Sequence, residues 1–209
     1  MLKDSDISLS QNIPAHKATI NTRIEKLTLT CNDLLGDQSE INLEIGCGHG
    51  HYLVAYADKH RDEFCIGIDL INKRIEKANN KVRRLGLTNM IFFKAHAKEL
   101  LQVLTKPPSL IKIFILFPDP WPKRRHSKYR LIQPEFLSGL ASLASPDASI
   151  FFRTDHKEYF KWAKAVFAAH NDWSIEPTMK WPFESSSYFQ EMMDDWQSLV
   201  VKRSNSLLG

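Results

Sequence analysis

A single carboxylate, Asp119, stands between two prolines and is followed at once by a cationic run. Pro118 and Pro120 have restricted φ angles and favour extended backbone at Phe117 and Asp119, so we expect the carboxylate to be held rigidly. The apolar run 111–116 immediately before it predicts a buried strand. Because open α/β sheets bind ligands at the carboxyl ends of their strands, Asp119 is a candidate catalytic acid at the mouth of a groove.

The residues from 121 to 130 include five basic side chains and no acidic one, although the whole chain has a net charge of only +4. The rest of the chain is therefore close to neutral, which favours a local docking surface for the phosphates of a nucleic acid. Trp121 and Tyr129 add flat surfaces on which bases can stack. A solvated loop without a partner is the alternative. The candidate substrate-binding residues in this run are Lys123, Arg124, Arg125, His126, Lys128 and Arg130.

A glycine-rich turn, Glu44-Ile45-Gly46-Cys47-Gly48-His49-Gly50, ends a second apolar run, 41–45. A helical pattern at 52–60 comes next, and a further apolar run, 64–68, leads to Asp69. Glycines let the backbone approach a ligand, and an acid at the end of the second strand can accept hydrogen bonds from both ribose hydroxyls. The combination predicts a nucleoside site whose candidate residues are Glu44, Gly46, Gly48, Gly50 and Asp69.

Glu44 decides which nucleoside cofactor this turn favours. A dinucleotide would place its pyrophosphate at the helix N-terminus, where the carboxylate would repel it. The ammonium and sulfonium groups of S-adenosylmethionine would instead be attracted by a nearby carboxylate. We therefore predict S-adenosylmethionine as the cofactor and methyl transfer, rather than nicotinamide chemistry, as the reaction class. A glycine turn chosen only for tight packing is the alternative, and it leaves Glu44 and Asp69 unexplained.

Three histidines lie near these motifs. His49 and His51 have no carboxylate or thiolate partner at ligand spacing, so no metal site is predicted. His96-Ala97 occupies the place after the third apolar run that usually lines the adenine in such a fold, where a neutral imidazole can hydrogen-bond or stack. A purely structural histidine is an equal alternative at that place. The three cysteines are widely spaced, and we expect them to be reduced, small apolar residues.

Apolar runs alternate with amphipathic segments along the chain, which predicts an α/β fold with a mostly parallel sheet and helices on both faces. The expected strands are 41–45, 64–68, 90–94, 111–117 and 148–153, and the expected helices are 52–60, 71–85, 98–104, 134–143 and 159–170. Two further runs, 173–175 and 196–202, are expected to add antiparallel edge strands. Residues 1–20 show no clear period and are predicted to form a flexible arm, followed by a helix over 21–35.

The size of the chain, 209 residues with 43% hydrophobic side chains, predicts one domain over 1–209. No apolar run approaches the ~20 residues of a membrane span. Residues 1–12 are polar and carry two acids where a signal peptide needs a basic and then an apolar segment. We therefore expect a cytoplasmic protein, and either a monomer or a homodimer.

With both motifs in hand, the chain resembles the tRNA (guanine-N(7)-)-methyltransferase family of bacterial type, over roughly residues 41 to 165. The most specific match is Pro118-Asp119-Pro120-Trp121-Pro122-Lys123, with Arg125-His126 and Lys128 after it, and Thr154-Asp155 is a second mark. The resemblance implies a Rossmann-like class I methyltransferase fold of seven strands with an antiparallel C-terminal strand. It also implies tRNA as the partner and ring nitrogen seven of a guanine in the tRNA variable loop as the methylated atom.

The resemblance also assigns roles to individual residues. It implies that Glu44, Asp69, the His96-Ala97 position and Asp119 contact S-adenosylmethionine, and that Asp119 is the catalytic residue. It further implies that Lys123 and Asp155 contact the substrate.

Two positions depart from the family pattern. His96 stands where Asp or Asn usually precedes Ala, and the Thr-x-Tyr-Glu motif is here Ser186-Ser187-Tyr188-Phe189. Ser186 and Tyr188 remain candidate substrate contacts, while Glu184 or Glu191 is left to replace the missing acid. Two alternatives therefore stay open: a methyltransferase of the same fold that acts on an exocyclic amine, and a catalytically weakened RNA-binding protein.

Overall fold

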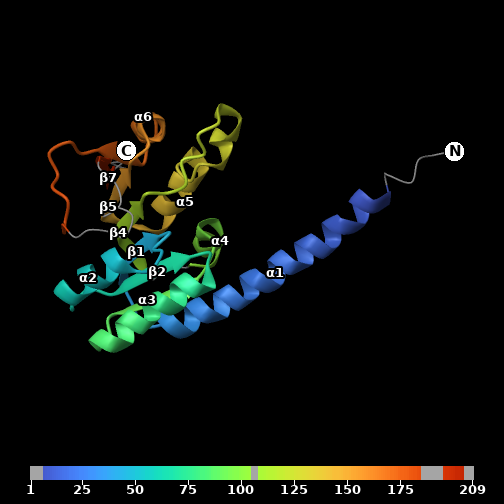
Figure 1. The fold of residues 1–209 in the computed structure, drawn as a ribbon, viewed down its shortest axis with the longest axis horizontal. Coiled ribbons are helices and arrows are strands. Elements are labelled where there is room, and N and C mark those ends of the chain that lie inside the picture. The colour runs from blue at the N-terminus through green and yellow to red at the C-terminus, as the bar shows by residue number, and fades with distance from the viewer. Residues whose placement is uncertain (1–6, 105–107, 185–194, 205–209) are drawn as a thin grey trace.

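The computed structural model describes residues 7–104, 108–184 and 195–204, with side chains from residue 19 onward. At its centre is a seven-stranded sheet with the strand order β3-β2-β1-β4-β5-β7-β6 (Figure 1). Strands β1 to β5 pair in parallel, as the alternating pattern predicted. The strands are β1 (Glu40–Ile45), β2 (Cys65–Asp69), β3 (Met90–Lys94), β4 (Ser109–Leu116), β5 (Ala144–Thr154), β6 (Trp173–Ile175) and β7 (Gln197–Arg203).

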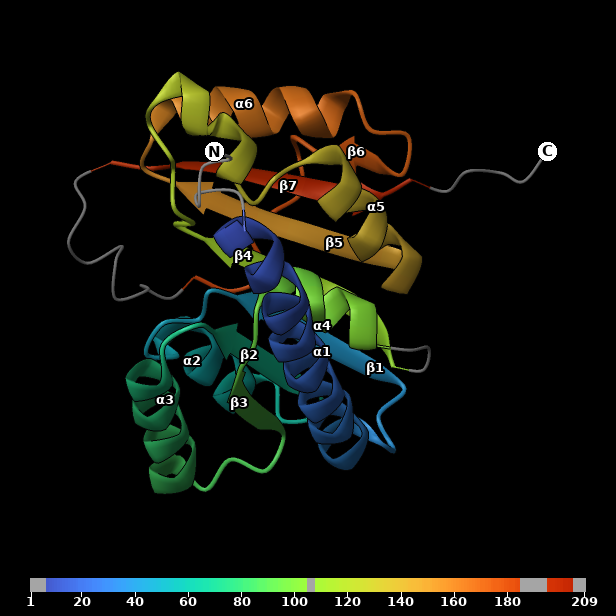
Figure 2. The ribbon, with the colours of Figure 1, turned by 90° about the vertical axis from the view of Figure 1, so that its right-hand side faces the viewer.

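Strand β7 differs from its expected place at the edge of the sheet. It runs antiparallel to both β5 and β6 and lies between them, so the edge strand is β6 (Figure 2). The reason is burial on both faces of β7: Leu199 and Val201 pack into one hydrophobic cluster and Val200 into the other. A strand that is apolar on both faces fits the interior of a sheet better than its rim.

Helices cover both faces of the sheet. One face packs against α1 (Ile7–Leu35), α4 (Ala97–Val103), α5 (Pro134–Leu143) and α6 (Lys157–Ala168). The other packs against α2 (His51–Lys59), α3 (Asn72–Leu85) and the side chains of Trp181 and Phe183. Successive residues of a strand point to opposite faces, so Leu43 enters the first cluster while Glu44 points toward the α2 side. Among the residues described, no helix is both long and apolar enough to cross a bilayer.

Most elements lie within a few residues of their predicted bounds, and β3, α5 and β6 have the predicted bounds. Helix α1 differs, because it begins at Ile7 rather than at residue 21 and runs through part of the predicted arm (Figure 1). Among the side chains described on this helix, the buried ones are Leu27, Cys31 and Leu35, near its carboxyl end. A 3-10 helix, η1 (Arg124–Tyr129), also forms within the basic run, where no element was predicted.

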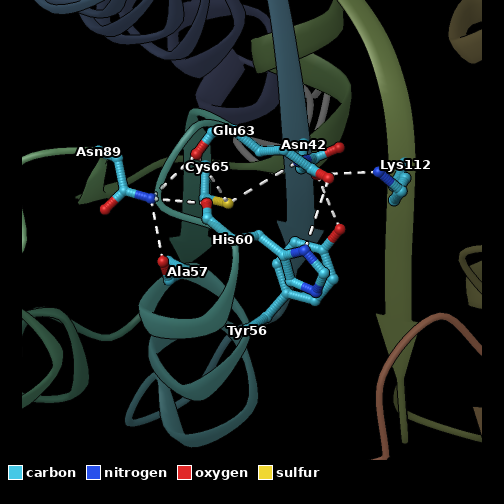
Figure 3. Close-up of polar contacts among 8 residues, drawn as sticks. All are labelled: Asn42, Tyr56, Ala57, His60, Glu63, Cys65, Asn89 and Lys112. Atoms are coloured by element: carbon cyan, nitrogen blue, oxygen red, sulfur yellow. Dashed lines mark hydrogen bonds and ion pairs between the residues drawn. The ribbon is translucent and has the colours of Figure 1, made fainter.

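A polar cluster ties the amino ends of the strands to the end of α2 (Figure 3). Its centre is Glu63, whose Oε2 accepts hydrogen bonds from Asn42 Nδ2 at 2.6 Å, Tyr56 Oη at 2.7 Å and Lys112 Nζ at 2.8 Å. Beside it, Asn89 Nδ2 donates to three backbone carbonyls at 3.0 Å each. Burial raises the pKa of Glu63, but the donors led by Lys112 outweigh it, and the net pKa is lowered. The cluster lies at the opposite edge of the sheet from Asp119, so we interpret it as structural.

Replacing Glu63 with alanine should lower the free energy of unfolding by about 2–4 kcal/mol, because three partly buried donors lose their shared acceptor. Urea unfolding followed by circular dichroism measures this change. Glu158→Ala is a matched control, since it also removes a lysine-paired acid, but from an exposed pair on α6. That control should be indistinguishable from the parent, and an equally stable Glu63→Ala variant would contradict the structural role.

The same variant has a defined pH dependence. Because the pKa of Glu63 is lowered in the folded protein, its stabilisation is present above the ordinary value of 4.5 and is lost as the pH falls through the lowered pKa. The stability difference between parent and Glu63→Ala should therefore shrink at acid pH, and unfolding curves at pH 7 and pH 3 measure it.

Candidate active site

The carboxyl ends of three neighbouring strands bring the predicted site residues to one edge of the sheet. In the ladder, Ile45 of β1 pairs with Ile115 of β4, and Leu116 of β4 pairs with Arg153 of β5. The next residues along the chain begin the glycine turn after β1 and the Pro-Asp-Pro segment after β4, and the Thr154-Asp155 pair lies at the carboxyl end of β5. Strand β2 adds Asp69 to the same edge. The juxtaposition predicted from the sequence is therefore present.

The Pro-Asp-Pro segment is flanked by two residues in the left-handed region. Phe117 has a φ of +50° and Trp121 a φ of +45°. The expectation that Phe117 is extended is therefore wrong. Its N–H donates to the carbonyl of Arg153 at 2.8 Å, and its half-buried ring packs into the α2-side cluster, which together hold the unusual backbone. Such conformations cost about 1–3 kcal/mol each and gather at functional sites. Asp119 itself is exposed to solvent.

An aromatic group with exposed cations follows Asp119. The ring centroids of Trp121 and Tyr129 lie 5.2 Å apart, and His126 lies 5.9 Å from each of them. Lys128 Nζ lies 5.2 Å from the centre of the Tyr129 ring. Helix η1 brings these side chains together, although they are several residues apart in sequence. The cations that face solvent here are Lys123, Arg124, Arg125 and Lys128.

Arg130 is the one member of the basic run that points inward. Its residue is 7% exposed, and its Nε donates to the carbonyl of Pro120 at 2.9 Å. Its guanidinium lies 5.2 Å from the ring centre of Tyr159 and 5.4 Å from that of Trp162. Arg130 therefore fastens the loop to α6, in contrast to the phosphate contact expected from the sequence. The physical reason is that planar guanidinium stacks on aromatic rings that α6 supplies.

The glycines of the turn are required for different structural reasons. Gly46 has a φ of +77°, and a Cβ there would meet no atom within 4 Å. Gly50 has a φ of +69°, and a Cβ would lie 2.6 Å from the Phe92 ring and 2.9 Å from the Ala78 side chain. Gly50 is therefore required for packing as well as for its backbone, whereas Gly46 leaves open space at the edge of the sheet. Gly48, also at positive φ, donates its N–H to Asp69 Oδ2 at 3.0 Å.

The two acids beside the turn have different partners. Asp69 is 6% exposed and accepts hydrogen bonds from the N–H groups of Gly48 and Ile71, with Arg74 Nη1 at 3.4 Å. Glu44 is 3% exposed, and its Oε2 is a buried oxygen with no hydrogen-bond partner. Burial raises the pKa of Glu44 to about 8; a backbone hydrogen bond from Leu53 opposes this shift and the charge of Asp69 adds to it. An orphaned buried carboxylate oxygen fits a cationic or hydrogen-bond-donating ligand.

The remaining predicted residues are placed as follows. His96 is exposed and caps α4, its Nδ1 accepting from the N–H of Lys98 at 3.3 Å, while Ala97 is buried. Asp155 is exposed directly after β5. Ser186, Tyr188 and Glu191 lie outside the described residues. Within the described residues, no group of three or more histidines, cysteines or acids is arranged to hold a metal ion.

Sequence reasoning missed a network that joins α2 and β5 to the 181–184 segment. Trp181 Nε1 donates to Tyr52 Oη at 3.1 Å, and that hydroxyl donates to the carbonyl of Phe183 at 3.2 Å. Arg153, 4% exposed, places its guanidinium carbon 4.0 Å from the centre of the Trp181 ring. The Nη2 of Arg153 also lies 3.4 Å from Glu184 Oε2. No local pattern marks contacts between residues this far apart along the chain.

Several known proteins are similar to this chain in sequence. A family model described as "Putative methyltransferase" matches residues 38–202. A tRNA (guanine-N(7)-)-methyltransferase of Caulobacter sp. (strain K31) is 32% identical over 154 residues, which cover 71% of this chain and 68% of that protein. A protein of the same name from Syntrophotalea carbinolica is 35% identical over 138 residues, which cover 66% of this chain and 58% of that protein. The matched regions thus span between a little over half and about two thirds of the length of these relatives.

Among solved structures, the crystal structure of TrmN from Thermus thermophilus superimposes with a TM-score of 0.56 at 16% identity, covering 85% of this chain and 48% of that one. A precorrin-6y C5,15-methyltransferase from Geobacter metallireducens gives a TM-score of 0.55 at 11% identity, covering 84% and 85%. At these identities the likeness concerns the fold, which is the class I methyltransferase fold. With the family model over most of its length and the Caulobacter relative over two thirds of both proteins, the chain belongs to the tRNA (guanine-N(7)-)-methyltransferase family.

Proposed function

We propose that this protein transfers a methyl group from S-adenosylmethionine to ring nitrogen seven of a guanine in the variable loop of tRNA. The observation that carries the proposal is that two groups of residues lie at the same edge of the sheet. One is the buried Glu44, whose Oε2 has no hydrogen-bond partner, beside an open glycine turn. The other is the exposed Asp119, which is followed by cations and aromatic rings. Family membership supports the reaction class and the nucleic-acid substrate.

The cofactor side of the site is the glycine turn with its two acids. When bound, S-adenosylmethionine supplies an electrophilic methyl group on a positively charged sulfur. Glu44 would hold a positively charged part of it, because its Oε2 is buried without a partner. The open space at Gly46 would admit the ligand, and Asp69 and the His96-Ala97 position would hold the nucleoside.

The base side of the site has little proton chemistry to perform. Ring nitrogen seven of guanine carries a free lone pair, so no general base is needed, and the protein's task is alignment and electrostatic stabilisation. Asp119 is the acid that would stabilise the positive charge as it develops on the base. Asp155, at the end of the neighbouring strand, would orient the base by accepting hydrogen bonds from the amino group and the ring N–H of guanine.

The RNA side of the site is the exposed basic run. Its cations would contact backbone phosphates and so fix the RNA without reading its sequence. The rings of Trp121 and Tyr129 would stack on an exposed base, which offsets the few kcal/mol needed to unstack it. Arg130 would act indirectly, since it holds the loop from inside.

Replacing both Arg124 and Arg125 with alanine should weaken tRNA binding and reduce its salt dependence. Each lost phosphate contact lowers the slope of log K against log salt by about 0.7–0.9. Filter binding of tRNA at several salt concentrations measures both effects. Arg61→Ala, which removes an exposed arginine near the end of α2, is the control. A double variant with the parent's slope would contradict the phosphate assignment.

The test of the function uses purified protein, labelled S-adenosylmethionine and an unmodified tRNA transcript. The expected result is incorporation of label into the tRNA, with mass spectrometry of the digested nucleosides locating the methyl group on nitrogen seven of guanine in the variable loop. A methyl group on an exocyclic amine would replace the proposed reaction with the amine alternative. Tight tRNA binding without incorporation would indicate an RNA-binding protein.

A further inference from the structure

A second concentration of positive charge lies outside the Pro-Asp-Pro loop, between α3 and the glycine turn. It is a groove of about 480 Å³ in the described part of the chain, which we call the α3 groove. Three cations, two histidines and one amide line it, and its lining includes no carboxylate. These residues are His49, His51, Lys77, Asn80, Lys81 and Arg84.

The cations of the α3 groove form a stripe along one helix. Lys77, Lys81 and Arg84 are separated by four and three residues, so they lie on one side of α3, away from its buried positions Ile75, Ala78 and Val82. Like charges at these spacings weaken an isolated helix by a few tenths of a kcal/mol per pair. A negatively charged ligand in the groove would reverse this cost.

The electrostatic field in the α3 groove is positive. Partial burial lowers the pKa of Lys81, and the neighbouring charges of Arg84 and Lys77 lower it further. Burial also lowers the pKa of His49, and so do the charges of Lys77, Lys81 and Arg74, against the opposite effect of Asp69. For both groups burial is the larger cause, and the charges of the neighbouring cations add to it.

The α3 groove is joined to the cofactor turn by a hydrogen bond. Lys81 Nζ donates to the carbonyl of His49 at 2.8 Å, and His49 is the residue between Gly48 and Gly50 of the turn. The groove therefore opens beside the edge of the sheet that holds the proposed site. In Figure 2 helix α3 and the loop between β4 and α5 lie on that same side of the molecule, below and above α2.

We propose that the α3 groove is a second RNA-binding surface, which holds backbone phosphates of the tRNA at a segment other than the one that carries the target base. A tRNA is an extended polyanion, and a groove lined by lysine, arginine and amide side chains fits its phosphates without selecting a sequence. This inference rests on the proposed function, because it takes tRNA to be the substrate.

The test removes the two exposed cations and keeps Lys81, which holds the turn. Lys77→Ala combined with Arg84→Ala should weaken tRNA binding at least tenfold at about 0.1 M salt and reduce the salt slope by about 1.4–1.8. Filter binding measures both values, and calorimetry should give an S-adenosylmethionine affinity close to the parent's. Lys77→Gln with Arg84→Gln repeats the test with side chains that keep more of the helix surface.

The control is a double variant with the same change of net charge, Lys26→Ala with Lys164→Ala. These exposed lysines lie on α1 and α6, which cover the other face of the sheet. The control should keep the parent's slope, so an equal loss in both double variants would overturn the groove as a site. A parent that methylates tRNA while the groove variants bind it unchanged would overturn the groove alone. A parent that binds S-adenosylmethionine but neither binds nor methylates tRNA would overturn both proposals.

Discussion

Replacing Asp119 with alanine should lower the single-turnover rate of methyl transfer to tRNA by about 10²-fold or more, the usual effect of losing a group that stabilises transition-state charge. The carboxylate follows β4 at the carboxyl edge of the sheet, in a segment that two left-handed residues, Phe117 and Trp121, hold in place. Because the cations that we propose to contact RNA lie elsewhere in the loop, affinity for tRNA should stay close to the parent's. Rapid-quench measurement of labelled methyl groups, with filter binding, separates rate from affinity.

Two companion variants make the Asp119 prediction specific. Asp119→Asn keeps the shape and removes the charge, so it should lose most of the rate if the charge stabilises the methylated base. Asp147→Ala removes an exposed acid near the opposite end of β5 and should keep the parent's rate. An Asp119→Ala enzyme with full single-turnover rate would remove this residue from the catalytic mechanism.

Replacing Glu44 with glutamine should weaken S-adenosylmethionine binding roughly 10- to 100-fold near pH 8, the value of one charged hydrogen bond. In the parent, burial raises the pKa of Glu44 to about 8, so a cationic ligand must displace a proton at neutral pH. The parent's affinity should therefore rise with pH up to about 8, while the glutamine variant's should stay nearly constant. Calorimetry between pH 6 and 9 measures both, and Glu40→Gln, exposed on the same strand, is the control.

Stability gives a second measurement at Glu44 that needs no cofactor. The folded protein holds this proton more tightly than the unfolded chain, whose carboxyl has its ordinary pKa of 4.5. The parent's free energy of unfolding should therefore fall as the pH rises from 4.5 through about 8. The Glu44→Gln variant has no buried carboxyl to ionise, so its free energy of unfolding should not fall over this pH range. At pH 9 it should therefore unfold at a higher temperature than the parent. Parallel losses of stability in both proteins would contradict the burial of an ionised Glu44.

Much of the fold could be predicted from local pattern, because the parallel strands are short apolar runs and the helices between them carry their own periodicity. The sequence 134–143 shows this clearly, since a proline opens the helix and apolar residues recur along one face. The place of β7 could not be predicted in this way. Its residues indicate a buried strand, but which strands lie on either side of it depends on pairing across long stretches of chain.

The candidate site was predicted in part for the same reason. Glu44, Asp69 and Asp119 follow apolar runs, so the topology rule alone brings them to one edge. The direction of Arg130 depends instead on rings that α6 supplies from 29 and 32 residues further along the chain. The hydrogen bond from Trp181 to Tyr52 likewise joins residues 129 positions apart, and no spacing rule marks it.

The position of β7 between β5 and β6 has a consequence for synthesis of the chain. Strand β6 leaves the ribosome before β7, and in the finished sheet its only described neighbour is β7. Until residues 197–203 emerge, the nascent protein exposes the unpaired backbone edge of β5, the strand that contains Phe151 and Phe152, to other chains. Open strand edges of this kind attract other chains. Premature termination before β7 should therefore yield an aggregating product, a vulnerability that arises from the order of the strands.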